Sequence, residues 1–194
     1  MDTNTLLLLV VVAVAIVVLA FAVISSRRRK SEELKERFGP EYEQAVEKYG
    51  DKSKAEQELE SREKRVEAFQ IHPLQPGERD RFAEEWRQTQ AEFVDNPDKA
   101  VAHADQLVKQ VMQARGYPIG DFEQRSADIS VDHPDVVSHY RTAHEIAQKQ
   151  AKGKATTEDL RQAMVHYRAL FEDLLEPEPA AENAETEREK EKGR

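Results

Sequence analysis

The stretch TEDLRQAMVHYRALFEDLL, residues 157–175, decides the fold class. Its apolar side chains recur at intervals of four, three, four and three residues, which places them on one face of an α-helix. They are Leu160, Met164, Tyr167, Phe171 and Leu174. Thr156 followed by Asp159 is typical of a capping box, a reciprocal pairing that starts a helix. The stretch therefore predicts an amphipathic helix that must bury one face against other helices.

Four further amphipathic helices precede this one in the sequence. We expect them at about 78–94, from Pro97 to the stop at Gly116–Pro118, at about 121–129 and at about 133–151. Short connections between amphipathic helices favour antiparallel neighbours in a bundle. Residues 71–175 are therefore predicted to form a small bundle of about four to five helices, and the fold class is all-α.

The composition restricts the possible functions. The chain has 194 residues and no cysteine, which excludes disulfides, thiolate nucleophiles and thiolate metal sites. Its formal charge is −9; residues 1–30 hold four basic side chains and one acidic one, or +3, so the remainder carries −12. A domain this acidic repels phosphate backbones, and we expect no binding to nucleic acid.

The first thirty residues predict a membrane anchor. Residues 6–24, LLLLVVVAVAIVVLAFAVI, are 19 consecutive apolar residues. As a helix they span about 28 Å, close to the hydrocarbon core of a bilayer. No lysine or arginine precedes the run, whereas Arg27, Arg28, Arg29 and Lys30 follow it in the basic juxtamembrane cluster, residues 25–30. Because the side richer in lysine and arginine stays in the cytoplasm, we expect residues 1–5 outside and the remainder in the cytoplasm.

A cleaved signal peptide is the alternative interpretation of the same segment. Ala20-Phe21-Ala22 has the small-x-small pattern of a cleavage site. However, the residues before the run carry no positive charge, and the pattern lies inside the apolar run. The four basic residues that follow would also resist export. These features favour a signal-anchor helix in the cell membrane over an exported domain.

Residues 31–70 are predicted to form a charged helical stalk. Ser31 is a candidate N-cap, Gly39-Pro40 interrupts the stalk, and Gly50-Asp51 marks a turn. A heptad-like coiled-coil row follows, but Arg62 occupies one of its positions; the row is Ala55, Leu59, Val66 and Phe69. Residues 176–194 are rich in Glu, Ala and Lys without an apolar stripe, and we expect a disordered acidic tail there.

No motif in the sequence predicts catalysis. The six histidines do not lie three or four residues apart, the spacing of a metal pair on one helix, so neither a metal nor a cofactor is predicted. His139-Tyr140-Arg141 recurs as His166-Tyr167-Arg168, and each tyrosine lies on an apolar face. The two hydroxyls could hold a ligand at the edge of the bundle or reach water. Tyr140, His144 and Tyr167 are the candidate ligand edge.

Several segments of the chain resemble an uncharacterised family of short bacterial proteins described as membrane or secreted proteins. These segments are residues 37–42 (RFGPEY), 81–86 (RFAEEW), 115–118 (RGYP), 130–134 (SVDHP) and 157–175. The resemblance implies a bacterial source and the same layout of an anchor followed by helices. It implies no activity.

The functional hypothesis that follows is a membrane-tethered, non-enzymatic module. The lipid bilayer would hold it through residues 6–24, and its helical domain would bind an unknown protein partner. The oligomeric state is left open. The alternatives are a helical sensor domain for a small ligand or a metal, and an exported helical domain.

Overall fold

The computed structural model describes residues 3–176, without the side chains of residues 3–17, 20 and 23. The described residues form eight helices and no strand, which confirms the all-α fold class. They divide into two compact units, Met1–Leu59 and Glu60–Arg194. The predicted disordered tail lies outside the described residues, apart from Glu176.

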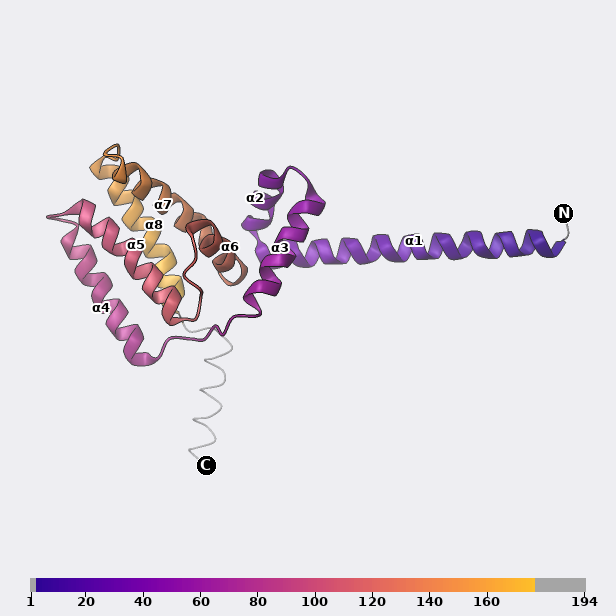
Figure 1. The fold of residues 1–194 in the computed structure, drawn as a ribbon, viewed down its shortest axis with the longest axis horizontal. Helices are drawn as coiled ribbons and strands as arrows, with labels where there is room; N and C mark the ends of the chain where they lie inside the picture. The colour runs from indigo at the N-terminus through magenta and orange to yellow at the C-terminus, as the bar shows by residue number, and fades with distance from the viewer. Residues whose placement is uncertain (1–2, 177–194) are drawn as a thin grey trace, which may run out of the picture. The chain divides into compact units, whose positions relative to one another are not determined.

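The first helix, α1 (Thr3–Phe38), includes the apolar run (Figure 1). In the described part of the chain, no helix has both the length and the apolar character needed to cross a membrane. The transmembrane helix predicted for residues 6–24 is therefore not supported, and most of that range lies among the side chains outside the described part. The predicted helix start at Ser31 is wrong, because α1 continues through it without a proline or glycine to break it.

The rest of the first unit follows two predicted breaks. Gly39 adopts a positive φ of 45° between α1 and α2 (Pro40–Tyr49), and Gly50 ends α2 in the left-handed conformation. Asp51 then accepts the N–H of Lys54 at 2.9 Å just before α3 (Lys52–Val66). Both breaks are confirmed. The buried apolar side chains of this unit are Leu34, Phe38, Tyr42, Ala45, Ala55 and Leu59.

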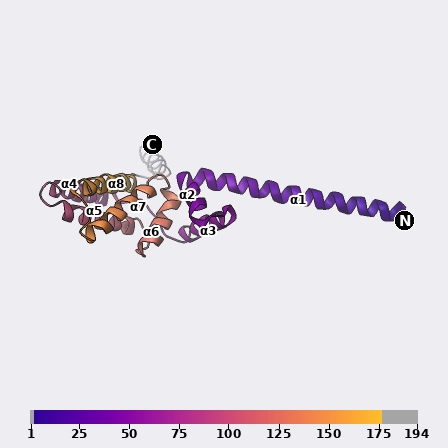
Figure 2. The ribbon, with the colours of Figure 1, turned by 90° about the horizontal axis from the view of Figure 1, so that it is seen from above.

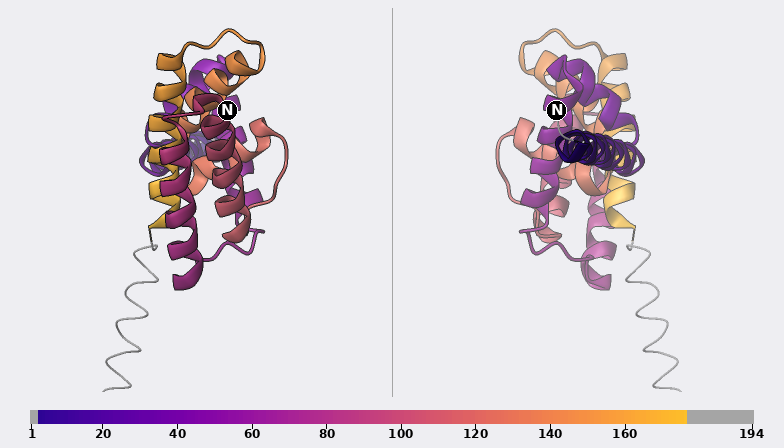
Figure 3. Two further views of the ribbon diagram at one scale, coloured as in Figure 1. Left: turned by 90° about the vertical axis from the view of Figure 1, so that its left-hand side faces the viewer. Right: turned by 90° about the vertical axis from the view of Figure 1, so that its right-hand side faces the viewer.

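The second unit contains the helical bundle. Its helices are α4 (Pro76–Glu92), α5 (Pro97–Ala114), α6 (Phe122–Asp132), α7 (Val137–Ala151) and α8 (Thr157–Leu175). In Figure 1, α5 lies between α4 and α8, and α8 also packs against α7. Figure 2 shows α6 next to α7. Seen from the side, α4, α5 and α8 run along a common direction (Figure 3).

The core of this bundle comes from the predicted apolar faces. Each of the five apolar residues quoted from α8 is buried. Trp86 of α4 stacks on Phe171 of α8, with ring centroids 4.7 Å apart. The capping box at Thr156 is present, with Thr156 and Asp159 each accepting the other's backbone N–H. Trp86 is buried at 5% exposure and is therefore a core residue of the bundle.

The start of α7 differs from the prediction. The sequence indicated a helix from residue 133, but α6 continues to Asp132 and α7 begins at Val137. Two observations explain why α6 extends beyond its predicted end at residue 129. Val131 is buried at 3% exposure, and Asp132 accepts a 2.7 Å hydrogen bond from the hydroxyl of Tyr117. His133 then ends α6 by donating its backbone N–H to Ile129.

The end of α3 packs within the second unit. Arg62 is 3% exposed and donates a 3.2 Å hydrogen bond to Ser130 of α6. Arg65 lies 2.8 Å from the carboxylate of Asp128, which is also buried. The structure thus divides the chain between Leu59 and Glu60, whereas the sequence indicated a division at residue 71. Arg62, which interrupts the heptad row, is a buried contact residue.

Candidate functional site

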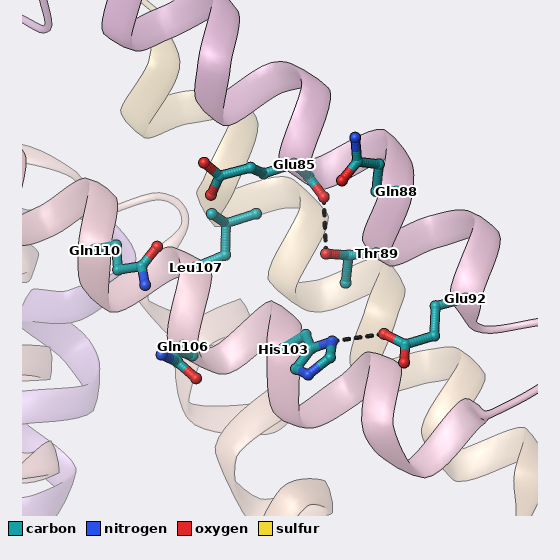
Figure 4. A pocket seen from close by; sticks show the side chains of 8 residues that line it. All are labelled: Glu85, Gln88, Thr89, Glu92, His103, Gln106, Leu107 and Gln110. Atoms are coloured by element: carbon teal, nitrogen blue, oxygen red, sulfur yellow. Dashed lines mark hydrogen bonds and ion pairs between the residues drawn. The ribbon is translucent and has the colours of Figure 1, made fainter.

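A groove of about 550 Å³ lies between α4 and α5 (Figure 4). We call it the α4–α5 groove. Helix α4 contributes one wall and α5 the other. The lining residues are Glu85, Gln88, Thr89 and Glu92 from α4, and His103, Gln106, Leu107 and Gln110 from α5.

The spacing of the lining residues explains why they face one another. On each helix the four residues are separated by three, one and three positions, which is the spacing of a single helix face. Thr89 and Leu107 are buried and form the floor of the groove. Gln88, Gln106 and Gln110 are exposed along its rim. The two helices thus bury their apolar faces and leave beside them a groove lined mainly by polar residues.

Two contacts within the groove hold its polar walls. The hydroxyl of Thr89 donates a 2.9 Å hydrogen bond to the carbonyl oxygen of Glu85 in the preceding turn. His103 Nδ1 lies 2.5 Å from the carboxylate of Glu92 and joins the two helices across the groove (Figure 4). Arg81 lies 3.9 Å from the carboxylate of Glu85. The carboxylates therefore have cationic or ionisable neighbours, and the exposed amides supply the remaining polarity.

The predicted ligand edge is an internal network rather than an open edge. Tyr140 and Tyr167 are both 0% exposed. The hydroxyl of Tyr167 donates to Asp105 at 3.0 Å, and Arg125 Nε donates to the hydroxyl of Tyr140 at 3.1 Å. Burial raises the pKa of both hydroxyls, and the Asp105 carboxylate raises the pKa of Tyr167 further. The sequence suggested that these hydroxyls either form an open ligand edge or reach water. Both are instead buried and bonded to partners inside the bundle.

His144 lies near the same network. Its ring stacks on Phe122, with centroids 3.6 Å apart and planes 9° from parallel, and Phe122 also contacts the ring of Tyr140. Its Nε2 is 2.9 Å from the amide of Gln148. Burial lowers the pKa of His144, which favours the neutral ring at pH 7. Whether the three predicted residues bind any ligand stays a prediction.

Two charged members of this network, Arg125 and Asp105, were not predicted from the sequence. Arg125 is 7% exposed and Asp105 lies on α5, and neither was named as a candidate site residue from the sequence. A signal for Arg125 existed, because it falls at the inward spacing between Phe122 and Ile129 on α6. For Asp105 no comparable signal exists, since acidic residues are frequent on every helix of this chain.

Two of the six histidines come together across helices rather than along one. His139 Nδ1 on α7 lies 2.7 Å from His166 Nδ1 on α8. Spacings within a single helix do not reveal a pair of this kind, because its two members lie on different helices. Among the residues that the structure describes, no group of three or more His, Asp and Glu side chains is placed to hold a metal ion.

The basic cluster predicted to set membrane orientation lies on α1. Arg27, Arg28, Arg29 and Lys30 are all exposed on this helix. The orientation that they imply stays a prediction.

Comparison with known proteins gives no relative: no family model matches the chain, and neither do any curated protein sequences or solved structures. The resemblance to short bacterial membrane proteins therefore stays a prediction.

Proposed function

We propose that the chain is a membrane-tethered, non-enzymatic interaction module whose bundle binds an extended segment of a partner protein in the α4–α5 groove. The observation that carries the proposal is that seven of the eight residues lining this groove have polar or charged side chains. Sites for small molecules are mostly apolar with a few polar groups, whereas Leu107 is the one apolar side chain in this lining. A polar segment of protein suits such a lining better.

The rim glutamines supply the chemistry of recognition. Each amide carries both donors and an acceptor, so it can pair with the N–H and C=O groups of an extended peptide backbone. Gln88 lies on one wall, and Gln106 and Gln110 lie on the other, so a segment in the groove meets amides from both helices. Glu85 and Glu92 add negative charge, which favours a segment with basic side chains.

The tether in this proposal is a transmembrane helix at residues 6–24, with the N-terminus outside and the bundle in the cytoplasm. Its support is the sequence: 19 apolar residues followed at once by four basic ones. A tether keeps the groove within a short distance of the membrane. Partners on the same membrane then meet it at an effective concentration of order mM for a short linker, without any new contact.

Site-directed photo-crosslinking tests the groove. A photoreactive amino acid replaces Gln106 in the full chain, expressed in its own cells, and a second variant carries it at Gln88. The matched control carries it at Val165, which is 49% exposed on α8 and does not line the groove. We expect one protein to be captured from both groove positions and not from Val165. Capture at Val165 alone, or at none of the three positions, would contradict the proposal.

Membrane attachment is tested separately. Deleting residues 6–24 should move the protein from the membrane fraction to the soluble fraction. A protease added to intact cells should leave the bundle uncut, and the mass of the mature N-terminus should show no cleavage after Ala22. Digestion of the bundle from outside, or a shortened N-terminus, would instead support the exported alternative.

A further inference from the structure

The two copies of the His-Tyr-Arg sequence place two histidine rings side by side. Helices α7 and α8 are consecutive and pack against each other (Figure 1). In each copy the tyrosine is buried and its hydroxyl is held by a charged partner, Arg125 for Tyr140 and Asp105 for Tyr167. These contacts fix the rotation of both helices about their axes. The preceding residue of each copy, His139 or His166, therefore meets the other at the helix interface.

The geometry of this pair leaves two nitrogen atoms converging on one point. The two Nδ1 atoms are 2.7 Å apart, and the ring centroids are 5.0 Å apart with planes inclined by 35°. Both rings are half-buried. At this distance one Nδ1 must carry a proton and the other a lone pair, since two N–H groups cannot face each other. A single proton thus lies between two good metal ligands.

A metal ion can take the place of that shared proton. Metal–nitrogen bonds of about 2.0–2.1 Å at a right angle separate the two nitrogens by about 2.9 Å, and a tetrahedral angle separates them by about 3.4 Å. The pair needs to open by about 0.2 Å for the first geometry and about 0.7 Å for the second. The smaller movement favours ions with right-angled coordination, Cu²⁺ and Ni²⁺, over tetrahedral Zn²⁺.

We propose that His139 and His166 form a two-histidine site for a divalent late transition-metal ion, Cu²⁺ or Ni²⁺. Water completes the coordination, because the rings are half-buried and reach the surface. When the ion binds, the ring that carried the Nδ1 proton changes to its Nε2–H tautomer, and each Nδ1 donates one lone pair to the ion. The ion releases two of its bound waters to solvent as the two Nδ1 atoms take their places, and its charge is unchanged.

The surroundings of the pair are compatible with this site. Arg168 lies two positions after His166 and is the basic residue nearest to it in the sequence. Its guanidinium is engaged by Glu172 at 2.7 Å, which offsets its charge.

Copper titration of the full chain in neutral lipid nanodiscs, followed by electron paramagnetic resonance, tests the site. We expect one equivalent of Cu²⁺ to bind with hyperfine coupling to two imidazole nitrogens. His139→Gln and His166→Gln should each weaken binding about tenfold or more, because each removes one arm of a chelate. The matched control is His72→Gln, an exposed histidine elsewhere, and it should leave binding unchanged.

Three results would overturn the proposal. Coupling to a single nitrogen in the unaltered protein would exclude a two-histidine site. If His166→Gln bound Cu²⁺ as tightly as the unaltered protein, the ion would lie elsewhere. The same would follow if the variant that carries both His139→Gln and His166→Gln still bound one equivalent of Cu²⁺, as binding at the terminal amine would allow. Should a variant fail to fold, which the fluorescence of Trp86 reports, the nitrogen count in the unaltered protein decides.

Discussion

Removing one hydroxyl from each buried tyrosine should cost unequal amounts of stability, and the difference tests the internal network. The substitutions are Tyr140→Phe and Tyr167→Phe. Both rings are 0% exposed and both keep their packing, so each change removes one hydrogen bond and leaves no large cavity. The difference between them therefore depends on the partner that each hydroxyl leaves behind.

The two partners are not equally able to compensate. Arg125 is 7% exposed, so Tyr140→Phe leaves a buried guanidinium N–H without its acceptor, at a cost of about 2–3 kcal/mol. Asp105 has a side chain 19% exposed and keeps Lys109 at 2.5 Å. Water can replace the lost donor there, so we expect Tyr167→Phe to cost about 1 kcal/mol.

The assay is urea denaturation of the full chain, followed by the fluorescence of Trp86. This is the sole tryptophan, 5% exposed and stacked on Phe171, so its signal reports the bundle independently of the first unit. We expect both variants to unfold at lower urea, with Tyr140→Phe the lower of the two. Equal midpoints would refute the reasoning about compensation. A gain of stability in either variant would indicate a hydroxyl retained for function at the expense of stability.

Further predictions use the same denaturation signal. Gly116→Ala should cost more than about 2 kcal/mol, because its φ is +96° and the new Cβ would lie 2.3 Å from the carbonyl oxygen of Gln70. Gly153→Ala, with φ +65° and open space, should cost about 1 kcal/mol; equal losses would contradict the steric argument. Thr156→Ala removes an N-cap and should cost about 1 kcal/mol, and an unchanged midpoint would show that the cap contributes nothing. For His166, burial and the neighbouring His139 lower the pKa in the folded protein below its ordinary value of 6.5. The unfolded chain therefore binds the proton first, and stability falls as pH decreases below about 6.5. Melting at pH 7 and pH 5 should show a smaller loss in His166→Gln than in the unaltered protein, and an identical loss would exclude this linkage.

Helix positions could be predicted where periodicity and capping agree. Helix α8 has the predicted bounds because its apolar residues repeat regularly and Thr156 starts it unambiguously. The boundary between α6 and α7 was missed because Pro134, next to the predicted start at residue 133, is a residue that favours the first turn of a helix. The side chain of Asp132 is instead engaged by Tyr117 from a preceding turn. Local sequence signals contain no information about such tertiary partners.

The candidate site was predictable only in part, for a related reason. Tyr140 and Tyr167 were recognised as inward-facing, but their hydroxyl partners lie on α6 and α5, helices that the motif does not include. The lining of the α4–α5 groove consists of common polar residues with no sequence signature. Contacts between helices depend on how the helices are rotated and paired, which a single helix pattern does not specify.

The position of Arg65 affects where the bundle can be cut from the rest of the chain. A recombinant fragment beginning at residue 71, where proline and glycine suggest a natural boundary, would lack this arginine. Asp128, 2% exposed, would then keep the amide of Gln124 at 2.8 Å but lose its cation. Stripping a buried carboxylate of its partner costs about 3 kcal/mol, a large share of the stability of a domain this size. A fragment that starts at Glu60 retains the pair and is the better choice for isolating these helices.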